Sequence, residues 1–313
     1  MATQQEIMKP RVAIVVVTYN RLNLLMDCLS ALLNQDESFE RLIVVDNCST
    51  DGTRDWLASW SDEQGELVQH FLLEENSGGA GGFSSGLDIA TKNGADWVWM
   101  MDDDAVPEPD ALGQLLKVAD DPQNIYGSLA VSGEQTAWLT TLVDEQCRVA
   151  TSAGDVPAKA RVQSLPFLGF LIHRKLVQSI GLPDPGFFIA ADDVEYCVRA
   201  VNHGADIFIA GHSRIEHPAS VPYPFKFFSI RLTCLRLPPW KRYYDTRNRL
   251  LIAKKHFGAR LIIETIPGSF LRLVAALIHE PDKLKQTWAF LAGFWDGLWG
   301  TKGRRHEKWG ILP

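Results

Sequence analysis

Short uncharged apolar runs alternate with helical patterns along the first part of the chain. Five of these runs have the length and composition of buried strands, at residues 12–17, 42–45, 68–73, 97–101 and 167–172. Leucines at helical spacing follow the first run, and helical patterns also follow residues 49–52 and the glycine-rich residues 77–82. Such a strand–helix–strand series predicts an α/β fold with a mostly parallel central sheet and right-handed crossovers.

The alternation weakens after residue 108. A helix is expected through Leu115 and Val118, whereas residues 120–160 are poor in apolar pattern and are expected to form an insert. Farther on, the pattern predicts a helix from Asp192 or Asp193 to Gly204 and a short strand at 206–210.

The end of the chain differs in kind. Helical patterns at 250–257, 270–279 and 288–298 follow one another with no strand between them. We therefore expect two regions, a catalytic α/β domain over residues 1–220 and a helical C-terminal region over residues 221–313.

The net charge of −7 hides a strong asymmetry between these two regions. Residues 221–313 hold 17 Lys and Arg against 6 Asp and Glu, and residues 1–220 hold 14 against 32. The C-terminal region is therefore expected to face something anionic, either a membrane surface or a phosphate-bearing substrate. Nucleic acid is not favoured, because long apolar stretches separate the basic residues and no nucleic-acid-binding motif is present.

Cysteines and targeting signals bear on location. The five cysteines form no CxxC pair, which suits a reducing cytoplasm. The N-terminus lacks the basic start and apolar stretch of a signal peptide, and no run of 18 uncharged apolar residues follows. We expect a soluble or peripheral cytoplasmic protein, and the sequence does not indicate its oligomeric state.

The segment Trp97–Asp104 carries the strongest chemical signal. Five bulky uncharged residues stop abruptly at Asp102, Asp103 and Asp104, and ligands of open α/β sheets bind just beyond the carboxyl ends of such strands. If the chain stays extended, Asp102 and Asp104 point to the same side and can share one divalent cation, Mg²⁺ or Mn²⁺. The alternative is a solvated acidic loop.

Other polar groups follow the first three predicted strands. The first strand ends in Thr18-Tyr-Asn-Arg21 without a GxGxxG fingerprint, and the second ends in Asp46-Asn47, which can recognise a base or ribose. Both segments also suit ordinary turns. The segment Asn76–Gly82 allows backbone N–H groups to approach a phosphate or sugar, unless it is merely a flexible loop.

A second acidic pair, Asp192-Asp193, stands at the start of a predicted helix. One interpretation is that one of the two residues serves only as the helix cap; the other is that a second acidic site supplies a proton acceptor separate from a metal-binding set. His217 is a candidate third metal ligand, although a lone histidine is usually structural.

Together these segments resemble the inverting GT-A glycosyltransferases of family 2. The shared motifs occur in that family's order, at residues 15–21, 44–50, 76–82, 102–104 and 187–199. Within the family, residues 76–83, 94–104, 216–218 and 243–248 look most like the galactofuranosyltransferases that build bacterial galactans.

The resemblance implies a GT-A fold, Rossmann-like, with a C-terminal helical extension, and a role for each motif residue. Residues expected to bind the UDP-sugar donor are Thr18, Arg21, Asp46, Asn47, Asn76, Gly79, Asp102 and Asp103. Those expected to hold Mn²⁺ or Mg²⁺ are Asp102, Asp104 and His217. Asp193 is expected to be the general base. Ala190-Ala191 precede the acidic pair where some relatives have a tryptophan, which leaves the acceptor open.

The implied reaction is transfer of galactofuranose from UDP-galactofuranose to a lipid-linked saccharide, at the inner face of the cell membrane. Competing hypotheses are transfer of another sugar such as rhamnose from a dTDP donor, sugar nucleotidyl transfer, and a sugar-binding module without catalysis. Replacement of Asp193 distinguishes the last of these, because a true base is required for turnover but not for donor binding.

Basic and aromatic residues near the C-terminus admit two interpretations. Arg247 and Lys241 or Arg242 either contact phosphate or lie on a solvated surface. The tail combines aromatic and basic side chains typical of a helix on an anionic membrane, and packing within the protein or a dimer is the alternative. These tail residues are Trp288, Phe290, Phe294, Trp295, Trp299, Lys302, Arg304, Arg305 and Lys308.

Overall fold

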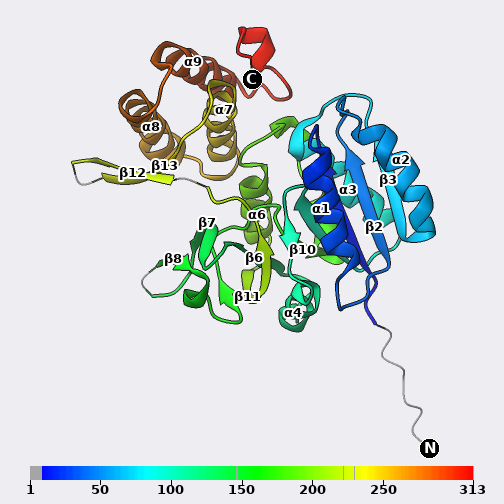
Figure 1. Ribbon diagram of the computed structural model, residues 1–313. Helices are drawn as coiled ribbons and strands as arrows, with labels where there is room; N and C mark the ends of the chain where they lie inside the picture. Colours follow the sequence, from blue (N-terminus) through cyan, green and yellow to red (C-terminus); the bar gives the residue numbers. More distant parts are fainter. Residues whose placement is uncertain (1–8, 146, 221, 229, 313) are drawn as a thin grey trace, which may run out of the picture.

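The computed structural model describes residues 9–145, 147–220, 222–228 and 230–312 (Figure 1). A large mixed sheet lies at its centre. The strands of this sheet are β1 (Val12–Thr18), β2 (Arg41–Asp46), β3 (Val68–Leu72), β4 (Trp97–Asp102), β5 (Val106–Pro107), β6 (Ile125–Ser132), β7 (Gln135–Thr141), β8 (Val149–Ser152), β9 (Ala160–Arg161), β10 (Phe170–His173) and β11 (Ile207–Glu216).

The helices of the described residues flank this sheet or follow it. They are α1 (Leu22–Leu33), α2 (Thr53–Gln64), α3 (Gly78–Lys92), α4 (Ala111–Val118), α5 (Arg174–Ile180), α6 (Asp192–Asn202), α7 (Pro239–His256), α8 (Ile266–His279) and α9 (Lys283–Trp299). A separate hairpin, β12 (Pro222–Phe227) with β13 (Ile230–Leu235), stands between the sheet and α7.

The first four strands confirm the predicted parallel sheet. They run in the order β3-β2-β1-β4, and every neighbouring pair among them is parallel. Side chains of β1 alternate between two cores: Ile14 packs with α1 and α2 on one face, and Val15 packs with α3 on the other. This order brings the carboxyl ends of β1, β2 and β4 to one edge, where the candidate site lies.

The middle of the chain departs from expectation. Residues 120–160 were expected to form an insert, but β6 is a buried strand between β10 and β11 in the sheet. Gly127 and Ser128 interrupt its apolar run, and Gly127 is required because a Cβ there would lie 2.7 Å from Leu165. β10 is shorter than predicted and antiparallel to both β4 and β6.

After residue 220 the chain forms the hairpin and a helical group (Figure 1). The hairpin was not predicted, and α7 begins at Pro239, eleven residues before the expected start. α7 packs along α9, where a Cβ on Gly293 would lie 2.3 Å from the carbonyl oxygen of Tyr243. The division of the chain at residue 220 stays a prediction.

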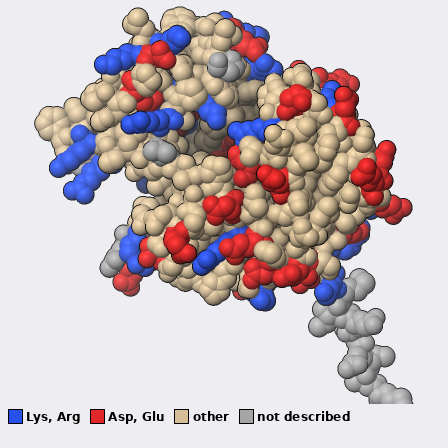
Figure 2. Space-filling view, viewed as in Figure 1, with Lys and Arg blue, Asp and Glu red and all other residues tan. Residues whose placement is uncertain are grey.

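Basic residues gather on the C-terminal helices and hairpin, and acidic residues dominate the visible sheet half (Figure 2). One helical run in the described residues, Leu261–His279, is long and apolar enough to cross a membrane by length and composition alone. It begins with a π-helical turn, Leu261–Thr265, continues as α8, and only 17% of it is buried. It carries Glu264 and Arg272, so it is not an uncharged run.

Candidate functional site

A pocket of about 480 Å³ lies at the carboxyl ends of β1, β2 and β4. It brings together nine of the residues predicted from the sequence to bind donor or metal. These are Thr18, Arg21, Asn47, Asn76, Gly79, Asp102, Asp103, Asp104 and His217. Asp46 and Asp193 are not among its lining residues.

The acidic triplet reaches the pocket through a turn. The chain was expected to stay extended so that Asp102 and Asp104 share a side, but β4 ends at Asp102 and residues 103–104 are a turn. The turn sends Asp103 back toward β1, where its carboxylate accepts hydrogen bonds from the Thr18 hydroxyl at 2.7 Å and the Tyr19 amide at 3.4 Å. All three carboxylates still line the pocket.

Arg21 and His217 neutralise part of this negative charge. The Arg21 guanidinium lies 2.6 Å from Asp104 Oδ2 and 3.3 Å from Asp103 Oδ1, and His217 Nε2 lies 3.3 Å from Asp104 Oδ1. Burial alone would raise the pKa of Asp104, but hydrogen bonds and charge from His217 and Arg21 lower it overall. Burial, followed by the charges of Asp104 and Asp103, holds the pKa of Asp102 well above its usual value.

The donor set of Asp102, Asp104 and His217 fits a divalent cation in its chemistry. Carboxylate oxygens and an imidazole nitrogen suit Mn²⁺ or Mg²⁺, and His217 Nδ1 is buried without a hydrogen-bond partner. Burial and the neighbouring carboxylates disfavour the ionised form of Asp102, which a bound cation would favour. As they stand, however, no three His, Cys, Asp or Glu side chains in the described ranges are arranged to hold a metal ion.

Asn47 fixes the glycine-rich segment. Its side-chain oxygen accepts the Ser77 amide at 2.9 Å and its side-chain nitrogen donates to the Gly78 carbonyl at 2.8 Å. The glycines were expected to form a loop before a helix at 83–93, but α3 begins at Gly78 and includes them. The physical reason is close packing, because a Cβ on Gly82 would lie 2.4 Å from Val17 in β1.

Asp46 has an internal partner. Its buried carboxylate lies 2.9 Å from Arg54 Nε and accepts the Ser49 amide. Arg54 in turn donates to the Leu73 carbonyl, which follows β3. These contacts brace the ends of β2 and β3 beside the pocket.

The C-terminal region completes the pocket with residues that the sequence interpretation did not assign to it. Trp240, Arg304 and His306 are lining residues. Lys241 also lines the pocket, which is compatible with the phosphate contact that was one of its two predicted roles. His306 packs in an aromatic cluster with Phe188, Trp240 and Tyr244, and its Nδ1 lies 2.8 Å from the Tyr244 hydroxyl. The Tyr243–Asn248 motif was the available signal, because it places Trp240 just before it on the same helix.

Arg242 and Arg247 are neither solvated nor in the pocket, contrary to both interpretations of them. Arg242 is buried and forms an ion pair with the buried Glu280, with Nη2 2.6 Å from Oε1. Arg247 is fully buried and donates to the carbonyl oxygens of Gly186, Phe187 and Gly303.

Asn248 joins Arg247 in holding the loop that precedes α6. Its side-chain nitrogen donates to the carbonyl oxygens of Phe187, Ile189 and Ala190, at 2.7–3.0 Å. Phe188, Ala190 and Ala191 all have positive φ, which is strained for residues with a Cβ. The two side chains from α7 therefore hold this loop in a conformation that it would not adopt alone.

The acidic pair opens α6 directly after this loop. Burial raises the pKa of both carboxyl groups, and the charge of Asp193 raises that of Asp192 further. Asp193 Oδ1 accepts the Val194 amide at 2.7 Å, while the charge of Asp192 contributes to the raised pKa of Asp102. A carboxylate with a raised pKa is a stronger base than an ordinary aspartate.

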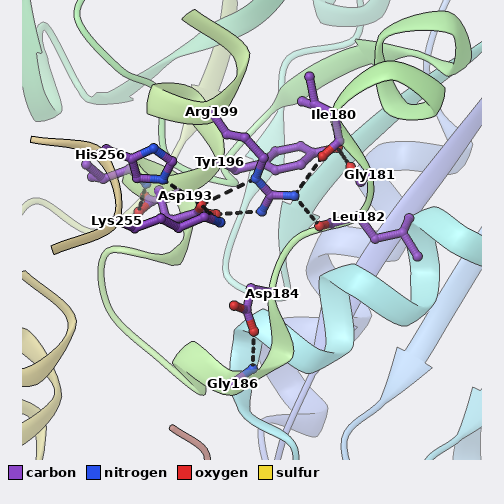
Figure 3. A network of polar contacts seen from close by, with 12 residues as sticks. Ile180, Gly181, Leu182, Asp184, Gly186, Asp193, Tyr196, Arg199, Lys255 and His256 are labelled. Carbon is purple, nitrogen blue, oxygen red and sulfur yellow. Dashed lines mark hydrogen bonds and ion pairs between the residues drawn. The ribbon is translucent and has the colours of Figure 1, made fainter. Parts of the chain in front are cut away.

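A buried carboxylate, Glu195, anchors the first turn of α6. Figure 3 shows the surrounding network, which includes Arg199, Lys255 and His256. The Glu195 carboxylate oxygens lie 2.5 Å from Arg199 Nη2, 2.8 Å from Lys255 Nζ and 3.0 Å from His256 Nε2. Lys255 and His256 belong to α7. Burial acts to raise its pKa, but these three partners lower the pKa of Glu195 to about 2. Arg199 also donates to the carbonyl groups of Ile180 and Leu182, so one network fixes Asp193's helix against both flanking segments.

Comparison with known proteins agrees with this geometry. The family model described as "Glycosyl transferase family 2" matches residues 13–181. The galactofuranosyltransferase GlfT1 of Mycolicibacterium smegmatis is 32% identical over 258 residues, covering 76% of this chain and 81% of the relative. The dTDP-rhamnosyl transferase RfbF of Shigella flexneri is 22% identical over 305 residues, covering 95% and 98% of the two chains.

Among solved structures, GalNAc-T7 with UDP, GalNAc and Mn²⁺ superposes with a TM-score of 0.61 at 14% identity. The match covers 96% of this chain and 57% of that one, and it confirms the predicted GT-A fold. With residues 13–181 matched by the family model and the likeness to GlfT1, the chain belongs to glycosyl transferase family 2 and is a glycosyltransferase.

Proposed function

We propose that the protein transfers galactofuranose, with inversion, from UDP-galactofuranose to a lipid-linked saccharide during cell-surface polysaccharide synthesis. The observation that carries the proposal is the pocket at the ends of β1, β2 and β4, which gathers Thr18, Asn47, the start of α3 and the acidic triplet. The similarity of the chain to a protein named galactofuranosyltransferase supports UDP-galactofuranose as the donor. The relative named dTDP-rhamnosyl transferase supports a dTDP-sugar as the second candidate.

In this proposal the pocket binds the donor through several kinds of group. Thr18, Arg21 and Asn47 contact the nucleotide diphosphate, and the amides at the start of α3 lie near the sugar. Lys241 and Arg304 add positive charge to the lining. Asp102, Asp104 and His217 hold Mn²⁺ or Mg²⁺, which supplies stabilisation of the negative charge on the departing diphosphate.

Asp193 acts as the general base in the same proposal. It removes the proton of the acceptor hydroxyl as that oxygen attacks the sugar from the face opposite the diphosphate, which produces inversion. Its raised pKa and the rigid attachment of α6 through Glu195 support this role. The exposed aromatic face of α9 and the apolar Leu261–His279 run support peripheral contact with the inner face of the cell membrane.

A donor-comparison assay tests the proposal. Purified protein with Mn²⁺ or Mg²⁺ is incubated with a galactose-terminated octyl glycoside and, in separate reactions, UDP-galactofuranose or dTDP-rhamnose. A glycoside product one galactofuranose unit larger, formed only with the UDP donor, is the expected result. Product formed only with dTDP-rhamnose would assign the reaction to the second candidate.

A further inference from the structure

A second cavity lies next to the acidic pair. The chain from Phe188 to Val194 lines the donor pocket at its beginning, through Phe188 and Ile189, and the second cavity at its end, through Ala191 and Val194. Asp192 and Asp193 lie between Ala191 and Val194 in the chain, so they directly adjoin the lining of the second cavity, although neither is itself a lining residue. The second cavity has a volume of about 500 Å³, and its other walls come from β13, α7, the π-helical turn and α8.

Two arginines line this cavity, and their positive charge is incompletely matched. Arg272 Nε is buried without a hydrogen-bond partner, and the side chain forms no ion pair with any residue in the described ranges. Its Nη1 donates a hydrogen bond to the Gly268 carbonyl in its own helix, at 3.2 Å. Arg249 pairs with Asp245 through Nε at 2.9 Å.

Burial and the charge of Arg249 lower the pKa of Arg272, which shows that the local environment disfavours its charge. The carboxylate among the lining residues, Glu264, is 63% exposed and pairs with Arg260. Arg272 is partly buried, and Asp245, which offsets some of its charge, is already paired with Arg249. A partly buried guanidinium without an ion pair of its own is costly, and phosphate oxygens match its donors in geometry and charge. The arginine pair therefore suits a diphosphate.

Most of the other residues that line the cavity are apolar. Its lining includes Ile230, Leu232, Ile252, Phe257 and Ile263. Neighbouring apolar side chains are strongly exposed, with Phe228 at 83% and Ile262 at 70%. An apolar lining beside one paired arginine, Arg249, and one arginine without an ion pair, Arg272, suits a ligand with a hydrocarbon chain and an anionic head.

We propose that this cavity binds the diphosphate and the first isoprenoid units of a polyprenyl-diphosphate-linked acceptor, with Arg249 and Arg272 contacting the diphosphate. The lipid-linked nature of the acceptor rests on the proposed function. The glycan attached to the diphosphate then extends past Ala191 to Asp193, which faces the acceptor hydroxyl. The hydrocarbon chain continues along the apolar surface of α8 toward the membrane.

Direct binding tests this proposal without requiring transfer. Farnesyl diphosphate is titrated calorimetrically into the full chain saturated with UDP and Mn²⁺, so that the donor pocket cannot take its diphosphate. Arg272→Gln is expected to weaken binding about tenfold or more, whereas Arg272→Lys retains most of it. Arg231→Gln is the matched control, since Arg231 is exposed on β13 between the lining residues Ile230 and Leu232 but does not line the cavity itself.

The binding results distinguish a polyprenyl diphosphate from bilayer headgroups as the ligand of this cavity. Equal affinity of Arg272→Gln and the unchanged protein for farnesyl diphosphate, with unchanged melting temperatures, would overturn the proposal. An equal loss of binding to phosphatidylglycerol vesicles and to farnesyl diphosphate would also overturn it, because Arg272 would then contact bilayer headgroups.

A kinetic comparison distinguishes failure of the cavity from failure of the proposed function. With the same glycan on a polyprenyl diphosphate or on an octyl group, Arg272→Gln should raise KM for the diphosphate acceptor alone, about tenfold. Arginine-dependent binding of farnesyl diphosphate without any galactofuranose transfer means that the donor is wrong and the cavity stands. Galactofuranose transfer combined with farnesyl diphosphate binding that does not depend on Arg272 means that the proposed donor is right and the proposed role of the cavity is wrong.

Discussion

The sheet half of the molecule, up to residue 220, and the C-terminal part after it are each organised by different interactions. In the sheet half, β1 and β4 are almost wholly apolar and buried, and their polar groups begin where the strands end. In the C-terminal part, buried charged and polar side chains join elements distant in sequence, as Arg242 does with Glu280 and Arg247 with Phe187. The first half therefore positions ligand groups by strand order, and the second positions the loop before α6 by specific hydrogen bonds.

The largest expected effect tests the chemistry at the junction of the two halves. Asp193→Asn should lower kcat by a factor of about 10²–10⁴, because the amide cannot accept the proton, while UDP affinity stays within about threefold. Single-turnover transfer and calorimetric UDP binding measure the two quantities. Asp192→Asn is the matched comparison, and a larger loss of kcat there than in Asp193→Asn would move the base to Asp192.

The pH profile sharpens the same assignment. The base must be ionised to work, so activity should fall as pH drops through its pKa. Because burial raises the pKa of Asp193, the acidic limb of kcat/KM should lie above the ordinary aspartate value of about 3.9. This limb should disappear from the residual activity of Asp193→Asn.

The next largest effect concerns the network that joins the halves through Glu195. Glu195→Gln should lower the free energy of unfolding by about 3 kcal/mol near neutral pH, because it leaves the largely buried Arg199 and the half-exposed Lys255 without their carboxylate. Since the pKa of Glu195 is lowered to about 2 in the folded state, its contribution is complete above the ordinary value of about 4.3 and is lost between there and about 2. Urea unfolding at several pH values measures this.

A control variant separates burial from charge in that network. Glu307→Gln removes a carboxylate that pairs with Arg304 but is half exposed. Its effect should stay below about 1 kcal/mol. Similar losses in both variants would mean that the Glu195 network contributes no more than a surface pair.

These differences explain which features could be predicted from the sequence. The strands β1, β2 and β4 were predictable because uninterrupted apolar runs dictate them, and the residues after them reached one pocket because parallel strands share their carboxyl edge. The strand β6 was missed because Gly127 and Ser128 break the run that burial on both faces normally produces. Glycine is needed at position 127 because Leu165 packs in the space that a side chain would occupy.

The C-terminal contribution to the site was harder to foresee for a physical reason. Arg247 looks like any basic residue of a helix, and only its partners sixty residues earlier make it a buried support of the loop. His306 is held at the pocket by packing against the rings of Phe188 and Tyr244, contacts that no local pattern encodes. Likewise Phe290, expected among the membrane-facing aromatics, is buried against Phe270.

A smaller effect tests how far the C-terminal part controls the loop. Asn248→Ala removes three hydrogen bonds that hold residues 187–190 and should lower kcat about tenfold, because the positive-φ loop relaxes and α6 shifts. Asn202→Ala is the control, as its side chain contacts His256 at an exposed site. Steady-state kinetics with both substrates measures the change, and equal kcat in the two variants would show that the loop keeps its shape unaided.

The smallest expected effect concerns the outer face of α9. Trp288, Trp295 and Trp299 are about half exposed or more on this helix, whereas the nearby cations Lys302 and Arg305 are paired with Asp184 and Asp296. Because its aromatic rings rather than these paired cations are free to contact lipid, Trp299→Ser should weaken partitioning onto anionic vesicles about threefold, with little dependence on salt. Vesicle sedimentation at low and high salt measures this, with Trp138→Ser, an exposed tryptophan of the sheet half, as the matched control. Equal weakening in both variants would remove membrane contact from α9 and leave the two halves of the molecule alike in this respect.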